Sequence, residues 1–200
     1  MKKVLSGVSA GILISIGGAV FLACEDRTIG AVLFSVALLC ICIKGYSLFT
    51  GKVGFIPEKH GREEISVLFL GLLGNLIATV LGGLAIRYAL PATGAAAEVI
   101  CASKLTQAAP QTFIRAVFCG ILMYLAVSIY RDKSSFAGIF FCVPVFILSG
   151  FEHSIADMFY FAAAGSFSGS VVAFIVMVLL GNAVGGMLLP CLAMVGREGK

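Results

Sequence analysis

The chain has 200 residues, of which 60% are hydrophobic and only 12% are charged, and its mean hydropathy is +1.08. Soluble domains carry a charge on about a quarter of their residues, so this composition excludes a soluble globular protein. The formal net charge of +4 is interpreted as a sign of membrane topology, and no nucleic acid is expected as a partner.

Six apolar segments follow one another along the chain, separated by charged residues, glycine and proline. Each has roughly the 20 residues or more that a helix needs to cross about 30 Å of hydrocarbon. They lack the alternating pattern of a membrane β-strand. We therefore expect an all-α, polytopic membrane protein whose single membrane domain covers residues 1–200. The six transmembrane helices are expected at about residues 5–24, 28–49, 64–88, 110–130, 135–163 and 170–195.

The basic residues predict the orientation in the membrane. The first segment resembles a signal peptide, but its apolar run from Val4 to Cys24 is long and five segments follow, so we expect it to be retained. Lysine and arginine collect in cytoplasmic loops. This predicts a multi-pass protein of the cell membrane with both termini in the cytoplasm. The inner residues are then Lys2, Lys3, Lys52, Lys59, Arg62, Arg131, Lys133, Arg197 and Lys200, and the outer ones are Arg27, Arg87 and Lys104.

Two pairs of short motifs suggest an internal repeat. The stretches "SLFTGK" at 47–52 and "SGFEHS" at 149–154 interrupt the second and fifth segments. The stretches "GNLIATVLGG" at 74–83 and "GNAVGGMLLP" at 181–190 place Gly-Asn pairs, with Asn75 and Asn182, in the third and sixth. With three spans in each half, the second half enters the membrane from the opposite side. The pattern therefore predicts an inverted repeat, which is common in transporters and channels.

Three ionisable residues, Glu152, His153 and Asp157, lie in the interrupted fifth segment. Charged groups at membrane depth are costly and are functional candidates. A broken helix leaves backbone groups that must be buried in protein or line a watery cavity, and the helix that starts after a break favours an anion. The seven cysteines have no metal-binding spacing and are interpreted as small packing residues.

The chain resembles the formate/nitrite transporter family in four stretches, with matching order and spacing. They are "LFTG" at 48–51, "FIRAVFCGILMYLAV" at 113–127, "GFEHSIADM" at 150–158 and "LGNAVGG" at 180–186. The resemblance implies an aquaporin-like arrangement with broken helices 2 and 5, and a homopentamer in membrane lipid with one pore in each protomer. It also implies small monovalent anions such as formate, nitrite or hydrosulfide as substrates, with no catalytic activity and no cofactor.

The resemblance also implies roles for individual residues. His153 matches the central pore histidine, Thr50 the threonine that faces it, and Lys104 a lysine that adds positive potential. Glu152 is more simply a cap for freed amides than a second pore group, and Asp157 is interpreted as a helix or subunit contact without a role in transport. The constrictions and supports are Phe34 and Phe146 (outer ring), Leu38, Leu48 and Phe49 (inner ring), and Asn75 and Asn182 (supporting residues).

Four positions depart from the family pattern, so substrate preference is not transferred. Gly120 and Asp157 stand where the family usually has asparagine, Ser47 replaces glutamate, and Lys52 replaces asparagine. A proton-linked mechanism through His153 is expected, because protonation makes the anion a neutral acid that crosses apolar rings at lower cost. His153 either gives the proton itself or polarises a proton drawn from water, and both possibilities stay open. Two alternatives stay open: a neutral-solute channel of the aquaporin or ammonia type, and a membrane enzyme or assembly subunit. The second would need a metal cluster or catalytic pair, which His153 and the loop residue His60 do not supply.

Overall fold

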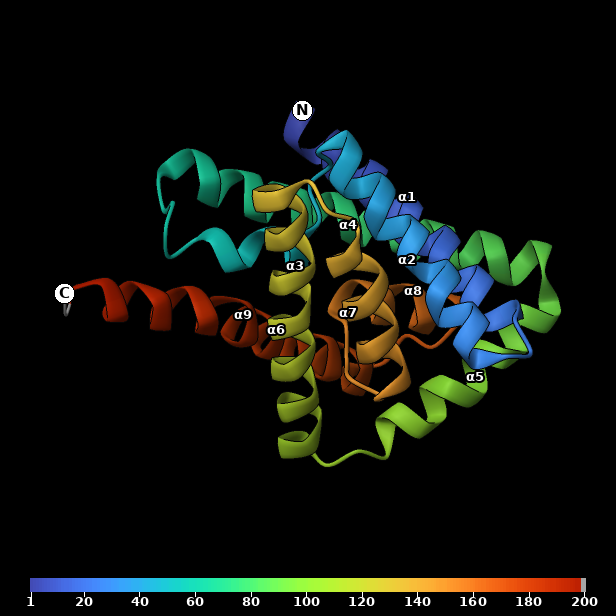
Figure 1. The fold of residues 1–200 in the computed structure, drawn as a ribbon. Coiled ribbons are helices and arrows are strands. Elements are labelled where there is room, and N and C mark those ends of the chain that lie inside the picture. Colours follow the sequence, from blue (N-terminus) through green and yellow to red (C-terminus); the bar gives the residue numbers. More distant parts are fainter. Residues whose placement is uncertain (199–200) are drawn as a thin grey trace.

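The computed structural model describes residues 1–198, which form helices joined by turns and contain no strand (Figure 1). This confirms the expected all-α class. Lys200, counted above among the inner basic residues, lies outside the described residues. The elements are α1 (Lys2–Ala23), α2 (Arg27–Lys44), α3 (Phe49–Lys52), the 3-10 turn η1 (Val53–Phe55), α4 (Arg62–Ala89), α5 (Pro91–Leu105), α6 (Ala109–Lys133), α7 (Ala137–Leu148), α8 (Ser154–Ala163) and α9 (Gly169–Glu198).

The helix lengths modify the expected set of six spans. In the described part of the chain, α1, α2, α4, α6 and α9 are long and apolar enough to cross a membrane, and α7 is shorter. The expected fifth span, 135–163, is two helices, α7 and α8, separated by residues 149–153. The expected second span ends five residues early, at Lys44, and residues 49–52 of the predicted break are helical. Six spans therefore exist only if α7 and α8 together count as one.

Both breaks begin with the same kind of helix end. Gly45 follows α2 directly, with φ of 68°, and Gly150 lies two residues after α7, with φ of 71°. In each half the residue after the glycine donates its backbone N–H to the carbonyl five residues earlier, at 3.0 Å. Glycine adopts this left-handed conformation without Cβ strain, so the two glycines end the helices at these points.

The chain is extended after each glycine until a new helix begins. Leu48 and His153 occupy the equivalent positions immediately before α3 and α8, and both have extended backbone angles. Each position therefore lies where a helix starts inside the protein.

The two halves of the chain repeat the same packing. α1 packs against α2 and α4, and α6 packs against α7 and α9. The two leading helices, α1 and α6, run in roughly opposite directions in Figure 1, as the predicted inverted repeat requires. Gly74 and Gly181 are equivalent contacts, since a Cβ on either would collide with a backbone carbonyl of the facing helix, that of Val4 or of Phe113. Close approach of helices through glycine is typical of membrane bundles.

Helix α5 is an element that the sequence patterns did not reveal. It occupies the stretch between the third and fourth spans and packs against α8. Pro91 at its start has a backbone angle suited to the first turn of a helix. Its buried side chains include Thr93, Ala97 and Cys101, which are spaced four residues apart and so share one face. Because of α5, Lys104 is held on a helix and not on a flexible loop.

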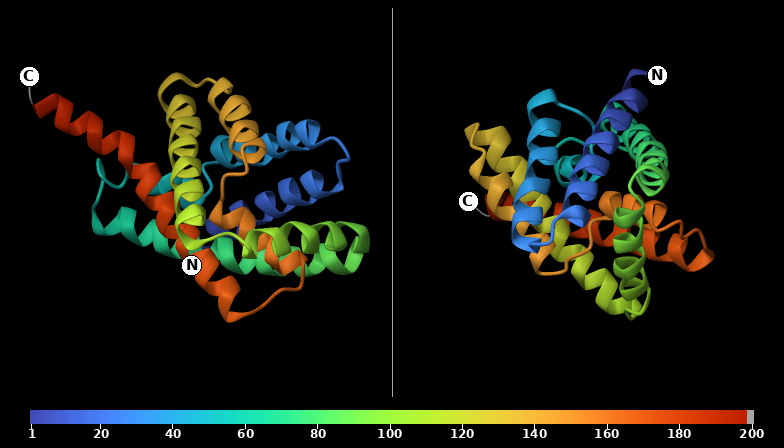
Figure 2. Two further views of the ribbon diagram at one scale, coloured as in Figure 1. Left: turned by 90° about the horizontal axis from the view of Figure 1, so that it is seen from below. Right: turned by 90° about the vertical axis from the view of Figure 1, so that its right-hand side faces the viewer.

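The C-terminal turns of α9 extend past the rest of the protein, as Figure 2 shows. Many large apolar side chains on the helices are exposed, among them Phe69, Leu81, Phe141 and Val172. A surface of this kind is suited to lipid and to contacts with other membrane subunits.

Candidate functional site

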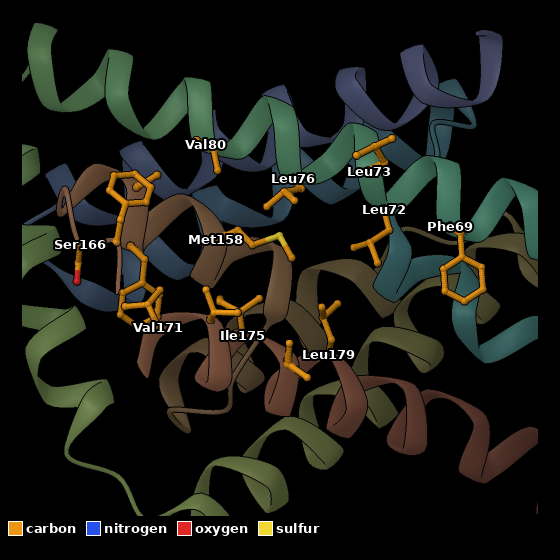
Figure 3. Close-up of a pocket in the computed structure, with 15 residues that line it drawn as sticks. Phe69, Leu72, Leu73, Leu76, Val80, Met158, Ser166, Val171, Ile175 and Leu179 are labelled. Carbon is orange, nitrogen blue, oxygen red and sulfur yellow. The ribbon is translucent and has the colours of Figure 1, made fainter. Parts of the chain in front are cut away.

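One large cavity is an apolar groove and is not suited to an anion. It has a volume of about 470 Å³ and lies between α4, α8 and α9 (Figure 3). Its walls are hydrocarbon apart from Ser166, and none of its described lining residues is ionisable. A bare anion there would lose its hydration and gain no counter-charge. The polar chemistry lies elsewhere in the protein.

A second cavity of about 350 Å³, here named the outer vestibule, is lined by the ionisable residues of the fifth segment. Glu152, His153 and Asp157 contribute to its wall, together with Lys104 from α5 and Phe146 from α7. The structure therefore brings the predicted histidine and lysine to one cavity. The other charged or aromatic lining residues are Arg27, Arg115, Phe21, Phe151 and Tyr160.

A third cavity of about 270 Å³, here named the inner vestibule, lies at the opposite end of α2. Arg27, at the start of α2, lines the outer vestibule, whereas Leu38 and Ile41 in its second half line the inner one. At about 1.5 Å per residue, Arg27 and Ile41 are about 21 Å apart along the helix axis. The two cavities thus approach the broken helices from opposite sides.

Apolar side chains close the space between the vestibules. The rings of Phe34 and Phe146 meet edge to face, with centroids 6.5 Å apart and an angle of 84°. Both side chains are buried, as are Leu38 and Leu48. Leu38 and Leu48 line the inner vestibule, whereas Phe49 is buried at the start of α3 and lies outside the described linings of both vestibules.

His153 lies at this closure and contacts α3 and α7. Its Nε2 is 2.8 Å from Oγ1 of Thr50, and its ring stacks on Phe146 with centroids 5.5 Å apart. Its Nδ1 accepts the backbone N–H of Ala156 at 3.1 Å. Since Nδ1 uses its lone pair there, Nε2 carries the hydrogen of the neutral ring and donates toward Thr50. The imidazole is thereby fixed as a neutral donor, and only 3% of His153 and 1% of Thr50 is exposed.

The first asparagine of the chain supports the break before α3. Asn75 accepts the backbone N–H of Phe49 at 3.0 Å through Oδ1. Its amide nitrogen donates to the carbonyls of Ser47 and Gly7, at 2.9 and 2.8 Å. One side chain thus satisfies the free amide of Phe49 and the free carbonyl of Ser47 inside the protein.

The second asparagine does the same for the break before α8. Asn182 accepts the N–H of Ser154 at 2.9 Å and donates to the carbonyls of Glu152 and Ala116, both at 2.8 Å. These are the only two asparagines in the sequence, and each fixes one break. The residue that holds the His153 segment is therefore Asn182.

Lys104 makes contacts that its predicted role did not include. Its Nζ contacts a carboxylate oxygen of Glu152 and lies 2.9 Å from Oδ1 of Asp157. Gln107 donates to the other oxygen of Glu152 at 2.7 Å. The carboxylate of Glu152 therefore caps no freed amide, which corrects the expectation for that residue. The positive charge of Lys104 is balanced locally by two carboxylates.

Two arginines of the outer vestibule, Arg27 and Arg115, were not predicted as site residues. Arg27 and Arg115 line it and are exposed, and neither forms an ion pair with a described carboxylate. Arg27 lies over the ring of Phe21, 5.4 Å from its centroid. From the sequence, Arg27 is a residue of a loop and Arg115 lies near the edge of a span. No local sequence pattern indicates that either residue lines a cavity. They supply positive potential that Lys104 does not.

Gly120, one of the departures from the expected pattern, has a packing explanation. A Cβ at this position would collide with the carbonyl oxygen of Asn182 and approach the backbone nitrogen of Gly186 to 2.8 Å. A side chain would therefore push α6 away from α9. The position leaves no room for an amide that could reach Lys104.

The chain is similar to known membrane transporters and channels. The family model described as formate/nitrite transporter matches residues 1–196. Formate-nitrite transporter 2 of Toxoplasma gondii is 33% identical over 186 residues, which cover 82% of this chain and 40% of that protein. Nitrite transporter NirC of Salmonella typhimurium is 28% identical over 170 residues, which cover 78% of this chain and 62% of that protein.

A solved structure described as a pentameric formate channel with formate bound is 26% identical, with a TM-score of 0.78, and the match covers 100% of this chain and 97% of that one. The chain spans less than two thirds of the length of the two curated relatives. The names of all three proteins are those of transporters and channels, not of enzymes.

Proposed function

The chain belongs to the formate/nitrite transporter family, and from this premise we propose that it carries small monovalent anions of weak acids across a membrane. Formate, nitrite and hydrosulfide are the substrates to test. The observation that carries the proposal is the pair of vestibules on either side of a buried closure, with His153 and Thr50 at that closure.

The outer vestibule attracts the anion, and the closure selects it. Arg27 and Arg115 raise the local concentration of anions at the mouth. Phe34, Phe146 and Leu48 exclude hydrated ions, because their side chains offer no hydrogen bond in place of water. A small substrate that becomes a neutral acid pays much less to pass between them.

His153 receives the substrate at the closure by donating a hydrogen bond to it. Its Nε2–H points at Thr50 and can turn to an oxygen or sulfur of the substrate without a change in ring charge. Thr50 then acts as acceptor or donor to the same substrate. The apolar, buried closure favours the protonated form of the substrate, because a neutral acid loses less hydration energy there than its anion. Transport is in this way linked to protons, and the neutral molecule passes between the phenylalanine rings.

The protein assembles as a homopentamer with one pore in each protomer. The similar pentameric formate channel supports this assembly, and the apolar outer faces give it surfaces for neighbouring subunits and lipid. Both termini face the cytoplasm. In the structure the inner vestibule carries Lys52 and Arg131, near the Lys3–Glu63 ion pair, which agrees with the excess of basic loop residues on that side.

Uptake by proteoliposomes tests the function. The parent should take up labelled formate, nitrite or hydrosulfide between about pH 5 and 8. His153→Phe keeps a ring but removes both nitrogens, so uptake should fall at least about tenfold. His153→Asn keeps a donor and should retain part of the uptake. His60→Phe alters the exposed histidine in the loop before α4 and should change nothing.

A neutral-solute channel stays the alternative because the closure is apolar and Lys104 is neutralised by its partners. Parent vesicles that pass water or ammonia but no anion would establish that alternative and refute ours. Normal anion uptake by His153→Phe at every pH would leave the transport function standing and remove His153 from it.

A further inference from the structure

The ion cluster beside His153 carries an excess negative charge. Among the residues that the structure describes, Lys104 is the one cation that contacts Glu152 and Asp157, and both carboxylates are about 1% exposed. With all three groups ionised, the cluster has a net charge of −1. An uncompensated charge in a buried site is strongly destabilising. It would also repel the anion that the vestibule is proposed to admit.

One carboxylate oxygen of the cluster has no partner. Glu152 accepts from Gln107 through Oε1 and from Lys104 through Oε2, and Oδ1 of Asp157 accepts from Lys104. Oδ2 of Asp157 is buried and has no hydrogen-bond partner among the described residues. A proton on Oδ2 would bring the cluster to neutrality and turn an unsatisfied acceptor into a donor. Asp157 lines the outer vestibule, one helical turn after His153.

The groups around Asp157 do not supply the missing charge. Arg87 on α4 bonds the carbonyl of Ala163 at the far end of α8, and Lys52 on α3 lines the inner vestibule. Residues 4–23 of α1 and 169–190 of α9 contain no ionisable side chain. The titratable and charged groups that face Asp157 or share its vestibule are Lys104 and Cys101 on α5, Cys119 and Arg115 on α6, Arg27 on α2, Glu152 and His153 before α8, and Tyr160 on α8.

We propose that Asp157 is the proton donor of the outer vestibule, holding a proton on Oδ2 and passing it to the substrate anion. This inference rests on the proposed anion transport and names the source of the proton. His153 is an unsuitable source, because its Nδ1 is bonded to the Ala156 amide and its ring is held neutral. Asp157 therefore donates the proton, and His153 receives the resulting neutral acid as a hydrogen-bond donor.

The transfer balances without a further reactant. The O–H bond of the Asp157 carboxyl breaks, an O–H or S–H bond forms on the anion, and Asp157 is left as a carboxylate beside Lys104. The neutral acid moves into the closure between the phenylalanine rings. Water or hydronium at the vestibule then returns a proton to Oδ2. Each cycle moves one anion and one proton, so transport carries no net charge.

Infrared spectroscopy tests the protonation without relying on transport. The purified parent near neutral pH should show the carbonyl band of a protonated carboxyl group, and Asp157→Asn should lack it. Asp26→Asn is the matched control, because Asp26 is exposed and asparagine is an equally good cap for α2; it should keep the band. Absence of the band in the parent, or its persistence in Asp157→Asn, would overturn the inference.

The pH profile of uptake gives the functional test. At about pH 8 little substrate is protonated in solution, so Asp157→Asn should lower formate uptake at least about tenfold. At about pH 5 the loss should be much smaller, because more protonated acid arrives from solution. The parent should transport one proton with each anion, and its rate of uptake should not change when a membrane potential is imposed.

The outcomes separate the two proposals. Lack of anion uptake by the parent refutes the proposed function. Two other outcomes refute the role of Asp157 and leave the proposed function intact. In both, the parent takes up the anion normally, and Asp157→Asn either loses the same fraction of uptake at every pH or loses none. A loss confined to high pH supports both.

Discussion

Asn182→Leu is expected to destabilise the protein strongly. The substitution keeps a similar volume but removes the bonds to the N–H of Ser154 and to the carbonyls of Glu152 and Ala116. The N–H of Ser154 and the carbonyl of Glu152 lie at the break and have no other hydrogen-bond partner among the described residues, so two buried groups lose their hydrogen bonds. The carbonyl of Ala116 lies inside α6 and is less affected.

The magnitude follows from these groups. Each buried backbone group left unsatisfied costs about 1–3 kcal/mol, and the third lost bond adds about 0.5–1.5 kcal/mol. The sum is about 2.5–7.5 kcal/mol. For a chain of this size about 1 kcal/mol shifts the unfolding midpoint by about 2–4 °C, so even the lower figure gives a fall of about 5–10 °C.

Thermal unfolding in mild detergent measures the effect. Labelling of the thiol of Cys119, which is fully buried between helices, reports the opening of the bundle. Asn75→Leu should give a similar fall, because Asn75 makes the equivalent bonds in the other half. Ser35→Ala is the control: the Ser35 hydroxyl is buried without a hydrogen-bond partner among the described residues, so its loss should be nearly neutral. If the unfolding midpoint of Asn182→Leu equals that of Ser35→Ala and of the parent, the hydrogen bonds of Asn182 do not stabilise the break, and the reasoning is wrong.

Two further predictions concern the path of the anion. Leu48→Ala removes a fully buried side chain at the first break, so uptake of acetate should rise relative to formate; an unchanged ratio would show that Leu48 does not restrict the pore. Replacing Arg27 and Arg115 by glutamine should raise the half-saturation concentration for the anion and weaken its dependence on ionic strength. Arg87→Gln, at a residue paired with Glu98 and outside both vestibules, is the control, and equal salt dependence in all variants would contradict the steering role.

Much of the fold could be predicted because its signals are local. The apolar segments, the interruptions near Thr50 and His153, and the paired Gly-Asn motifs are each contained in a few neighbouring residues. The all-helical class and the repeat were correctly predicted from them, and the family was correctly predicted from the four stretches that resemble it. The exact position of the first break was wrong by a few residues, because the left-handed Gly45, and not Ser47, ends the helix. Helix α5 was missed because its 15 residues are too few for a span and lie between two spans, although its alanines favour a helix.

The sequence by itself determined that this protein is a helical membrane protein with two broken helices and a histidine at one break, since hydropathy and helix-ending glycines act over short stretches of chain. Only the tertiary structure decided what surrounds that histidine. Thr50 reaches it across 103 residues, and Lys104 reaches Glu152 across 48. Such contacts depend on how α3 and α5 pack against α8, and no local pattern specifies that packing. The packing is also what places two carboxylates around one lysine and directs Arg115 to the vestibule.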